Sequence, residues 1–199
     1  MRTTDVTKTS AGGTARRAQL VGCAIDALVE LGYARTSVAE VARRAGVSKG
    51  VVTYHFPSKE DLLGEVVVSL YRDAGEQIAR AGAGDSVMSE LEAYITSNLA
   101  FVAENPRHVR AVMEVASNVR PGDGRGEDPL VTHLQELIER GQASGELAGV
   151  VDAGVLAVTI RASIDAAAAR AAVDPAADPR AHARHLATLV RLALRTEEP

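Results

Sequence analysis

Apolar residues recur along this chain with the spacing of amphipathic helices. Val21, Ala24, Ile25 and Leu28 follow the i, i+3, i+4, i+7 pattern of a helix with one buried face, and Gly32 provides a stop after them. Apolar and polar residues nowhere alternate for long enough to indicate a strand. The sequence therefore predicts an all-α fold of about nine helices.

Helix-capping residues mark where several helices begin. Ser37 to Glu40 has the pattern of a capping box, Gly46 ends the helix that follows, and Ser48 opens a short third helix that ends at Pro57. Ser58 opens a fourth helix, which we expect to run to about residue 81. Three later helices are predicted to begin at an N-cap followed by a proline, at Asn105-Pro106, Asp128-Pro129 and Asp178-Pro179.

The second and third predicted helices have the arrangement of a helix-turn-helix. A capped helix, a turn at Gly46 and a second capped helix of about two turns form the plan in which the second helix enters the major groove of DNA. The residues expected to pack against the preceding helix are Val38, Val41, Val47 and one of Val51 and Val52.

The other side of the third predicted helix carries polar residues that have no evident folding role. These residues are Lys49, Thr53, Tyr54 and His55. Lys49 can donate to guanine acceptors, the methyl group of Thr53 can contact a thymine methyl, and Tyr54 can bond a phosphate or pack on a sugar. This pattern favours sequence-specific binding to double-stranded DNA.

One stretch resembles a known family signature almost position by position. It reads Thr36-Ser-Val-Ala-Glu-Val-Ala-Arg-Arg-Ala-Gly-Val-Ser-Lys-Gly-Val-Val-Thr-Tyr-His-Phe-Pro-Ser-Lys-Glu-Asp-Leu-Leu63, and it is similar to the helix-turn-helix of the tetracycline-repressor (TetR/AcrR) family. A helix ending in Leu-Gly-Tyr33 before it and a long helix after it fit the same family. The chain departs from the pattern at Thr53, where the family often has tyrosine.

The resemblance implies a set of DNA contacts. Phosphates would be held by Thr36, Ser37, Tyr54, His55 and Lys59, and the bases would be faced by Lys49, Gly50 and Thr53, with Ser48 at the start of the same helix. Ser37 and Ser48 are also fully explained as helix caps. His55 has the alternative of packing beneath Phe56 against the fourth helix.

These elements divide the chain into four expected parts. Residues 1–13 are a polar, disordered tail, residues 14–57 the helix-turn-helix domain, residues 58–81 a connecting helix, and residues 82–199 a regulatory and dimerisation domain. Residues 152–173 are apolar on nearly every side and predict a buried central helix. Small residues there, with a stripe that holds Leu186, Leu189 and Ala193, predict a homodimer through the last two helices, about residues 152–195, as in the family.

The charge of the chain is unevenly distributed. Residues 1–60 carry nine Lys and Arg against five Asp and Glu, whereas residues 61–199 carry thirteen against twenty-one, for a net charge of −4. A basic N-terminal third is where a polyanion would dock. The single cysteine, Cys23, excludes a disulfide within the chain, and no apolar run of about 18 residues indicates a membrane span. With no secretory signal at the N-terminus, we expect a cytoplasmic protein.

The C-terminal part holds candidates for a small-molecule site. The family encloses its ligand among the corresponding helices, and Tyr94, Asn98 and Phe101 form a mixed aromatic and polar stripe. The full set of candidate ligand-binding residues is Tyr94, Asn98, Phe101, Met113, Glu114, His133, Arg161 and Asp165. The alternative for each is ordinary core packing with polar tips in solvent, and Arg161 and Asp165 can instead neutralise each other or cross a subunit interface.

Other patterns in the sequence give only weak support for a metal, phosphate or catalytic site. His182 and His185 are three apart, but no third ligand is near them in the sequence, so no metal site is predicted. Residues 122–126 superficially resemble a phosphate loop but follow no strand and lack its spacing. Without a nucleophile–base set or a cofactor loop, we expect no enzyme activity and no cofactor. The sequence predicts a dimeric, ligand-responsive repressor of a palindromic operator, and the alternative is an effector-independent DNA-binding regulator.

Overall fold

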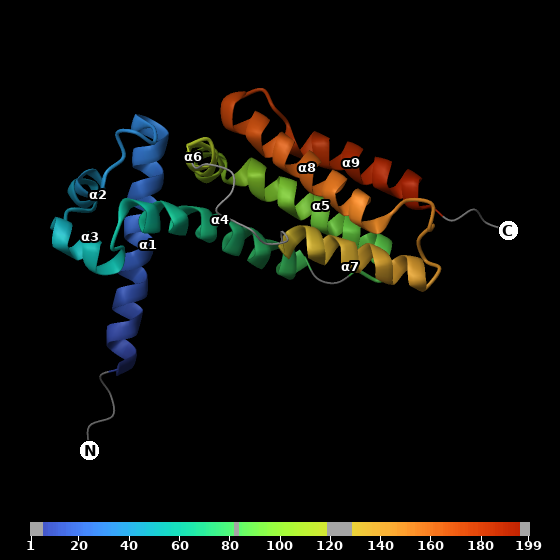
Figure 1. Cartoon of the computed structure of the whole chain (residues 1–199), viewed down its shortest axis with the longest axis horizontal. Coiled ribbons are helices and arrows are strands. Elements are labelled where there is room, and N and C mark those ends of the chain that lie inside the picture. The colour runs from blue at the N-terminus through green and yellow to red at the C-terminus, as the bar shows by residue number, and fades with distance from the viewer. Residues whose placement is uncertain (1–5, 82–83, 119–128, 196–199) are drawn as a thin grey trace, which may run out of the picture. The chain divides into compact units, whose positions relative to one another are not determined.

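The computed structural model describes residues 6–81, 84–118 and 129–195, which form helices and turns without a strand (Figure 1). The helices in these ranges are α1 (Val6–Leu31), α2 (Val38–Ala45), α3 (Lys49–His55), α4 (Lys59–Ala81), α5 (Val87–Glu104), α6 (Pro106–Ala116), α7 (Pro129–Ala143), α8 (Ala153–Val173) and α9 (Pro179–Leu194). The predicted all-α fold is confirmed. The predicted loop at residues 121–127, the cap at Asp128 and the first residues of the predicted tail lie outside the described ranges.

The helices form two compact units. Among the described residues, 6–71 and 110–118 make the first, which we call the head unit, and 72–81, 84–109 and 129–195 make the second, the body unit. Two helices change unit along their length: α4 begins in the head unit and ends in the body unit, and α6 runs the opposite way.

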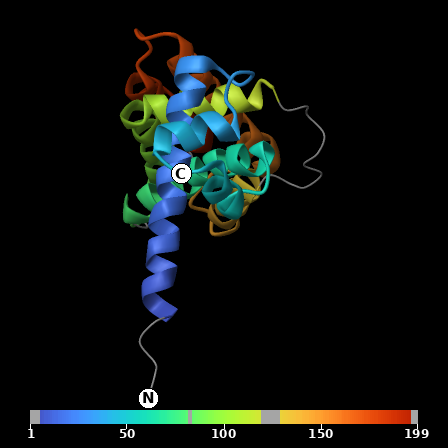
Figure 2. The same ribbon diagram turned by 90° about the vertical axis from the view of Figure 1, so that its left-hand side faces the viewer.

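The head unit surrounds one apolar cluster. In Figure 2, α2 and α3 lie across the C-terminal half of α1, and α2 contacts both of its neighbours. Val52 is the inward valine of α3 and is fully buried, while Val51 is only half-buried. The cluster consists of Leu20, Val21, Ala24, Leu28, Val41, Ala42, Val52, Phe56, Leu62, Leu63, Val66, Ala111, Val112 and Val115.

The predicted helix ends in the head unit are confirmed. Gly32 and Gly46 follow α1 and α2 with φ of 78° and 66°, the left-handed conformation that glycine adopts without steric cost. The start of α1 differs from the prediction, because the helix extends back to Val6 through residues assigned to a tail. That segment has no apolar stripe, so hydrophobic spacing gives no sign of it.

In the body unit, α5 is the central helix and contacts α7, α8 and α9. The prediction that α8 is buried on nearly every side is wrong. Ile160 and Ile164 are buried, but Val155 and Val158 are 62% and 55% exposed. The chain covers only one side of α8, and sequence alone cannot tell an apolar face that packs internally from one left outside. Within the described residues, no helix has the length and apolarity needed to cross a bilayer.

Candidate nucleic-acid interface

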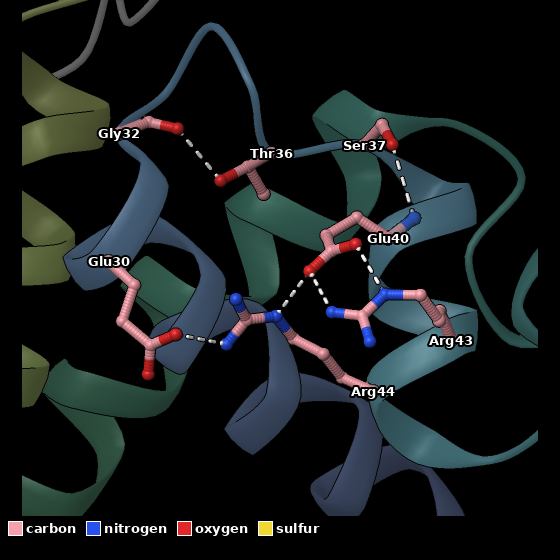
Figure 3. A network of polar contacts seen from close by, with 7 residues as sticks. All are labelled: Glu30, Gly32, Thr36, Ser37, Glu40, Arg43 and Arg44. Atoms are coloured by element: carbon pink, nitrogen blue, oxygen red, sulfur yellow. Dashed lines mark hydrogen bonds and ion pairs between the residues drawn. The ribbon is translucent and has the colours of Figure 1, made fainter.

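The N-terminus of α2 is fixed by two hydroxyl groups. Ser37 is the N-cap, and its Oγ accepts the backbone N–H of Glu40 at 3.2 Å. The Thr36 hydroxyl donates to the carbonyl of Gly32 at 2.9 Å, and Thr36 is buried (Figure 3). Both groups therefore hold the α1–α2 turn, and only Ser37 of the two predicted phosphate contacts is exposed.

A charged network covers one side of α2, as Figure 3 shows. The Glu40 carboxylate accepts Arg43 Nε and Arg44 Nε at 2.8 and 2.7 Å, and Arg44 Nη1 also donates to Glu30 at 2.8 Å. The hydrogen bonds from the two arginines lower the pKa of Glu40 from 4.5 to about 2. Only half of the predicted capping box has formed, because the Glu40 side chain bonds these arginines instead of the start of the helix.

The helix α3 presents the face that sequence reasoning assigned to bases. Ser48 caps it by accepting the N–H of Val51 at 3.3 Å, and Lys49 and Gly50 are exposed. The Thr53 hydroxyl donates to the carbonyls of Lys49 and Gly50, at 3.2 Å each. The hydroxyl group is thus satisfied within the helix.

The C-terminal end of α3 carries two aromatic rings. Tyr54 is 84% exposed, and its ring meets the half-buried ring of His55 edge to face at 5.2 Å. This contact does not test the alternative in which His55 packs beneath Phe56 against the fourth helix, which stays a prediction. Tyr54 offers a large amphipathic surface next to the exposed face of α3.

Lys59 begins α4 and bonds the turn after α1. Its ammonium group donates to the carbonyl of Tyr33 at 2.7 Å and lies 4.1 Å from the centre of the Tyr33 ring. The backbone N–H of Tyr33 in turn donates to the carboxylate of Glu114 at 2.8 Å. Lys59 therefore has a structural partner in the turn after α1, and so does Glu114, which sequence reasoning did not anticipate.

Arg17 was also missed by sequence reasoning. Its guanidinium bonds the carbonyl of His55 and the carboxylate of Glu65, and lies over the ring of Phe56. No pattern in the sequence distinguishes it from the neighbouring Arg16, since arginines ahead of a helical stripe are ordinary surface composition.

The predicted ligand-binding residues are only partly brought together. Tyr94, Asn98 and Phe101 are buried in the body unit, and Asn98 donates its amide to the carbonyl of Tyr94 at 2.8 Å. The rings of Tyr94 and His133 are 6.2 Å apart. Both contribute to a groove of about 190 Å³ lined by Ile78, Ala79, Glu90, Ala93, Tyr94, His133 and Leu137. Met113 and Glu114 belong to the head unit, so these two do not join that group.

Arg161 is buried in α8 and forms an ion pair with Asp165 on the same helix. Burial opposes its charge, but the hydrogen bonds and charge of Asp165 outweigh it and raise the pKa of Arg161. His182 shares a 2.8 Å hydrogen bond with Ser163. Across the described part of the chain, no group of three His, Cys, Asp or Glu side chains is arranged to hold a metal ion.

Comparisons with known proteins agree with this geometry. Residues 23–66 match the family model of "Bacterial regulatory proteins, tetR family". The regulator BetI of Stenotrophomonas maltophilia is 35% identical over 85 residues, which cover 42% of this chain and 43% of that protein. Less than half of the length of such curated relatives is therefore matched.

Solved structures match over most of the chain. A Rhodococcus crystal structure described as a TetR-family transcriptional regulator is 26% identical, with a TM-score of 0.74 over 88% of this chain and 98% of that one. The FadR regulator of Bacillus subtilis, solved in complex with stearoyl-CoA, shares the fold at 17% identity, with a TM-score of 0.69 over 87% and 96% of the two chains. The head unit therefore holds a helix-turn-helix segment that matches the tetR family of bacterial regulatory proteins, and the chain is similar in fold to TetR-family transcriptional regulators.

Proposed function

We propose that this protein is a ligand-responsive transcriptional repressor that binds an approximately palindromic operator as a dimer. The observation that carries the proposal is the exposed face of α3, a short helix that offers Lys49, Gly50 and Tyr54 to the outside while Val52 is buried. In a helix-turn-helix, this second helix enters the major groove. The division into a DNA-binding domain (14–57), a connecting helix (58–81) and a regulatory domain (82–199) follows from this assignment.

Within this proposal, Lys49, Gly50 and Thr53 face the bases. Since the Thr53 hydroxyl already donates within the helix, its methyl group is the part available for a thymine methyl. Ser37, Tyr54, His55 and Lys59 contact the phosphates of the DNA backbone. Thr36 and Ser48 contribute indirectly, because they fix the starts of α2 and α3. The amino-acid set is that expected of phosphate positioning combined with direct base contact.

A matched pair of substitutions at Thr53 tests the DNA-binding proposal. The operator is first identified by selecting bound genomic fragments, starting from the protein's own upstream region, and affinity is measured by fluorescence anisotropy. Thr53→Val keeps the methyl group and should keep the preference for the operator over a scrambled duplex. Thr53→Ser keeps the hydroxyl and should lose part of that preference, by up to about 1 kcal/mol, the size of one buried methyl group. Equal behaviour of both variants would overturn the methyl contact, and a wild-type protein without preference for any fragment would overturn the function.

The dimer would form through the outer side of α8 and α9. Val155 and Val158 on α8 and Leu189 and Leu192 on α9 are all more than half exposed. Exposed apolar side chains on two packed helices are typical of an interface, and two such helix pairs form a four-helix bundle. Leu189→Glu should convert the dimer to a monomer in sedimentation equilibrium, while Thr96→Glu on an exposed position of α5, outside the proposed interface, serves as a control for added charge.

The small-molecule effector would bind in the body unit. The groove beside Tyr94 and His133 is lined on one side by Ile78 and Ala79 of α4, the helix that begins in the core of the head unit. An effector acts only through a difference in affinity between two conformations, and about 2.7 kcal/mol changes their ratio roughly a hundredfold. The B. subtilis FadR complex makes fatty acyl-CoA thioesters a first class to screen by thermal shift. A protein that no compound stabilises or releases from DNA would favour the alternative of an effector-independent regulator.

A further inference from the structure

Arg17 connects three helices of the head unit. From α1, its Nη1 donates to the carbonyl of His55 at 2.9 Å and its Nη2 to the carboxylate of Glu65 on α4 at 2.5 Å. The guanidinium carbon also lies 4.2 Å from the centre of the Phe56 ring. One side chain therefore holds the C-terminal end of α3 to the helices on either side of it.

The helix α3 depends on such a contact because it has little core of its own. It is seven residues long, and Val52 is its buried residue, followed by Phe56 at the C-cap. The carbonyl of His55 is in the last turn of the helix, where a positive charge is favourable. Glu65 then balances the charge of Arg17, with only 16% of its side chain exposed.

We propose that Arg17 and Glu65 are positioning residues for DNA binding: they fix the orientation in which α3 presents Lys49 and Thr53, without contacting DNA themselves. This inference rests on the proposed function. The competing explanation is a direct phosphate contact, since 43% of the Arg17 side chain is exposed. The two explanations predict opposite effects for the loss of the Glu65 carboxylate.

The test compares Glu65→Gln and Arg17→Met with a control at the neighbouring position, Arg16→Met. Among the described contacts, Arg16 bonds only Gln19. If Arg17 positions α3, Arg17→Met weakens operator binding about tenfold, the size of one lost charge-assisted hydrogen bond, and Glu65→Gln also weakens it. Arg16→Met, with the same loss of charge, weakens it less. If Arg17 binds phosphate, Glu65→Gln instead strengthens binding, because a competing carboxylate is gone, and this result overturns the proposal.

A second readout separates this inference from the proposed function. Amide hydrogen exchange of residues 52–56 in the free protein should quicken in Arg17→Met and stay unchanged in Arg16→Met, with circular dichroism as the check on overall folding. Unchanged exchange in Arg17→Met overturns the positioning role whatever the DNA result. If exchange is faster in Arg17→Met but the wild type prefers no duplex, the inference that Arg17 positions α3 still holds, and the proposed function is refuted instead.

Discussion

Glu114 links α6 to the turn after α1, and its replacement tests how strongly. Its carboxylate accepts the Tyr33 N–H at 2.8 Å and lies 3.3 Å from where a β-carbon on Gly32 would be. The carbonyl of Tyr33 is also held, because it accepts a hydrogen bond from the ammonium group of Lys59 at 2.7 Å. Both polar groups of the Tyr33 backbone are therefore held by charged side chains from distant parts of the sequence.

The expected cost follows from the kind of bond. A hydrogen bond to a charged group contributes about 1.5–3 kcal/mol, and the half-buried position of Glu114 lets water replace part of it. We expect Glu114→Ala to lower the free energy of unfolding by about 1–2 kcal/mol, and Glu114→Gln by about half as much because its amide oxygen still accepts. For a chain of this length, Tm should fall by about 2–8 °C in Glu114→Ala.

Denaturant unfolding followed by circular dichroism measures the change, with Glu136→Ala on an exposed position of α7 as the matched control. Hydrogen exchange at the Tyr33 amide gives a local readout and should accelerate about 5–30-fold. The reasoning is refuted if Glu114→Ala and Glu136→Ala agree within about 0.5 kcal/mol and the Tyr33 amide is unaffected. If Glu114→Ala leaves stability unchanged but alters the response to an effector, the sequence prediction that Glu114 binds ligand is supported.

Three further substitutions test the head unit. Gly46→Ala places a side chain at φ 66° with nothing within 4 Å of its β-carbon, so we expect backbone strain alone to cost about 1–2 kcal/mol in denaturant unfolding. Gly50→Ala should leave stability equal or raise it by up to about 1 kcal/mol, yet weaken operator binding in anisotropy titrations, because its methyl group occupies space between α3 and the bases. The pKa of Glu40 is lowered from 4.5 to about 2 in the folded protein, so its stabilising contribution is complete above pH 4.5 and is lost as the pH falls towards 2. The difference in unfolding free energy between the wild type and Glu40→Gln should shrink over that range, and a constant difference would contradict the assignment.

The helix-turn-helix could be predicted from the sequence because its signals are local. Ser37, Gly46 and Ser48 each act within a few residues of their own position, and the structure places them as caps and turn. The contacts of Arg17, Lys59 and Glu114 could not be predicted, because their partners are 26 or more residues away and leave no periodic trace. For the same reason, the predicted ligand set combined residues that the fold divides between two units.

The head unit offers DNA less free charge than its composition indicates. The Glu40 carboxylate bonds both Arg43 and Arg44, so these arginines are already paired before DNA arrives. Each phosphate that a cation neutralises adds about 0.9 to the slope of log affinity against log salt, and paired arginines contribute less. Glu40→Gln keeps the backbone N–H that Ser37 caps but removes the carboxylate charge. Arg44 keeps its bond to Glu30, so the variant frees mainly Arg43. It should therefore steepen this slope by up to about 1 per head and tighten binding to operator and scrambled duplex alike. Anisotropy titrations at several salt concentrations measure both quantities, and parallel lines for the two proteins would mean that these arginines contribute to the fold of α2 and not to the hold on DNA.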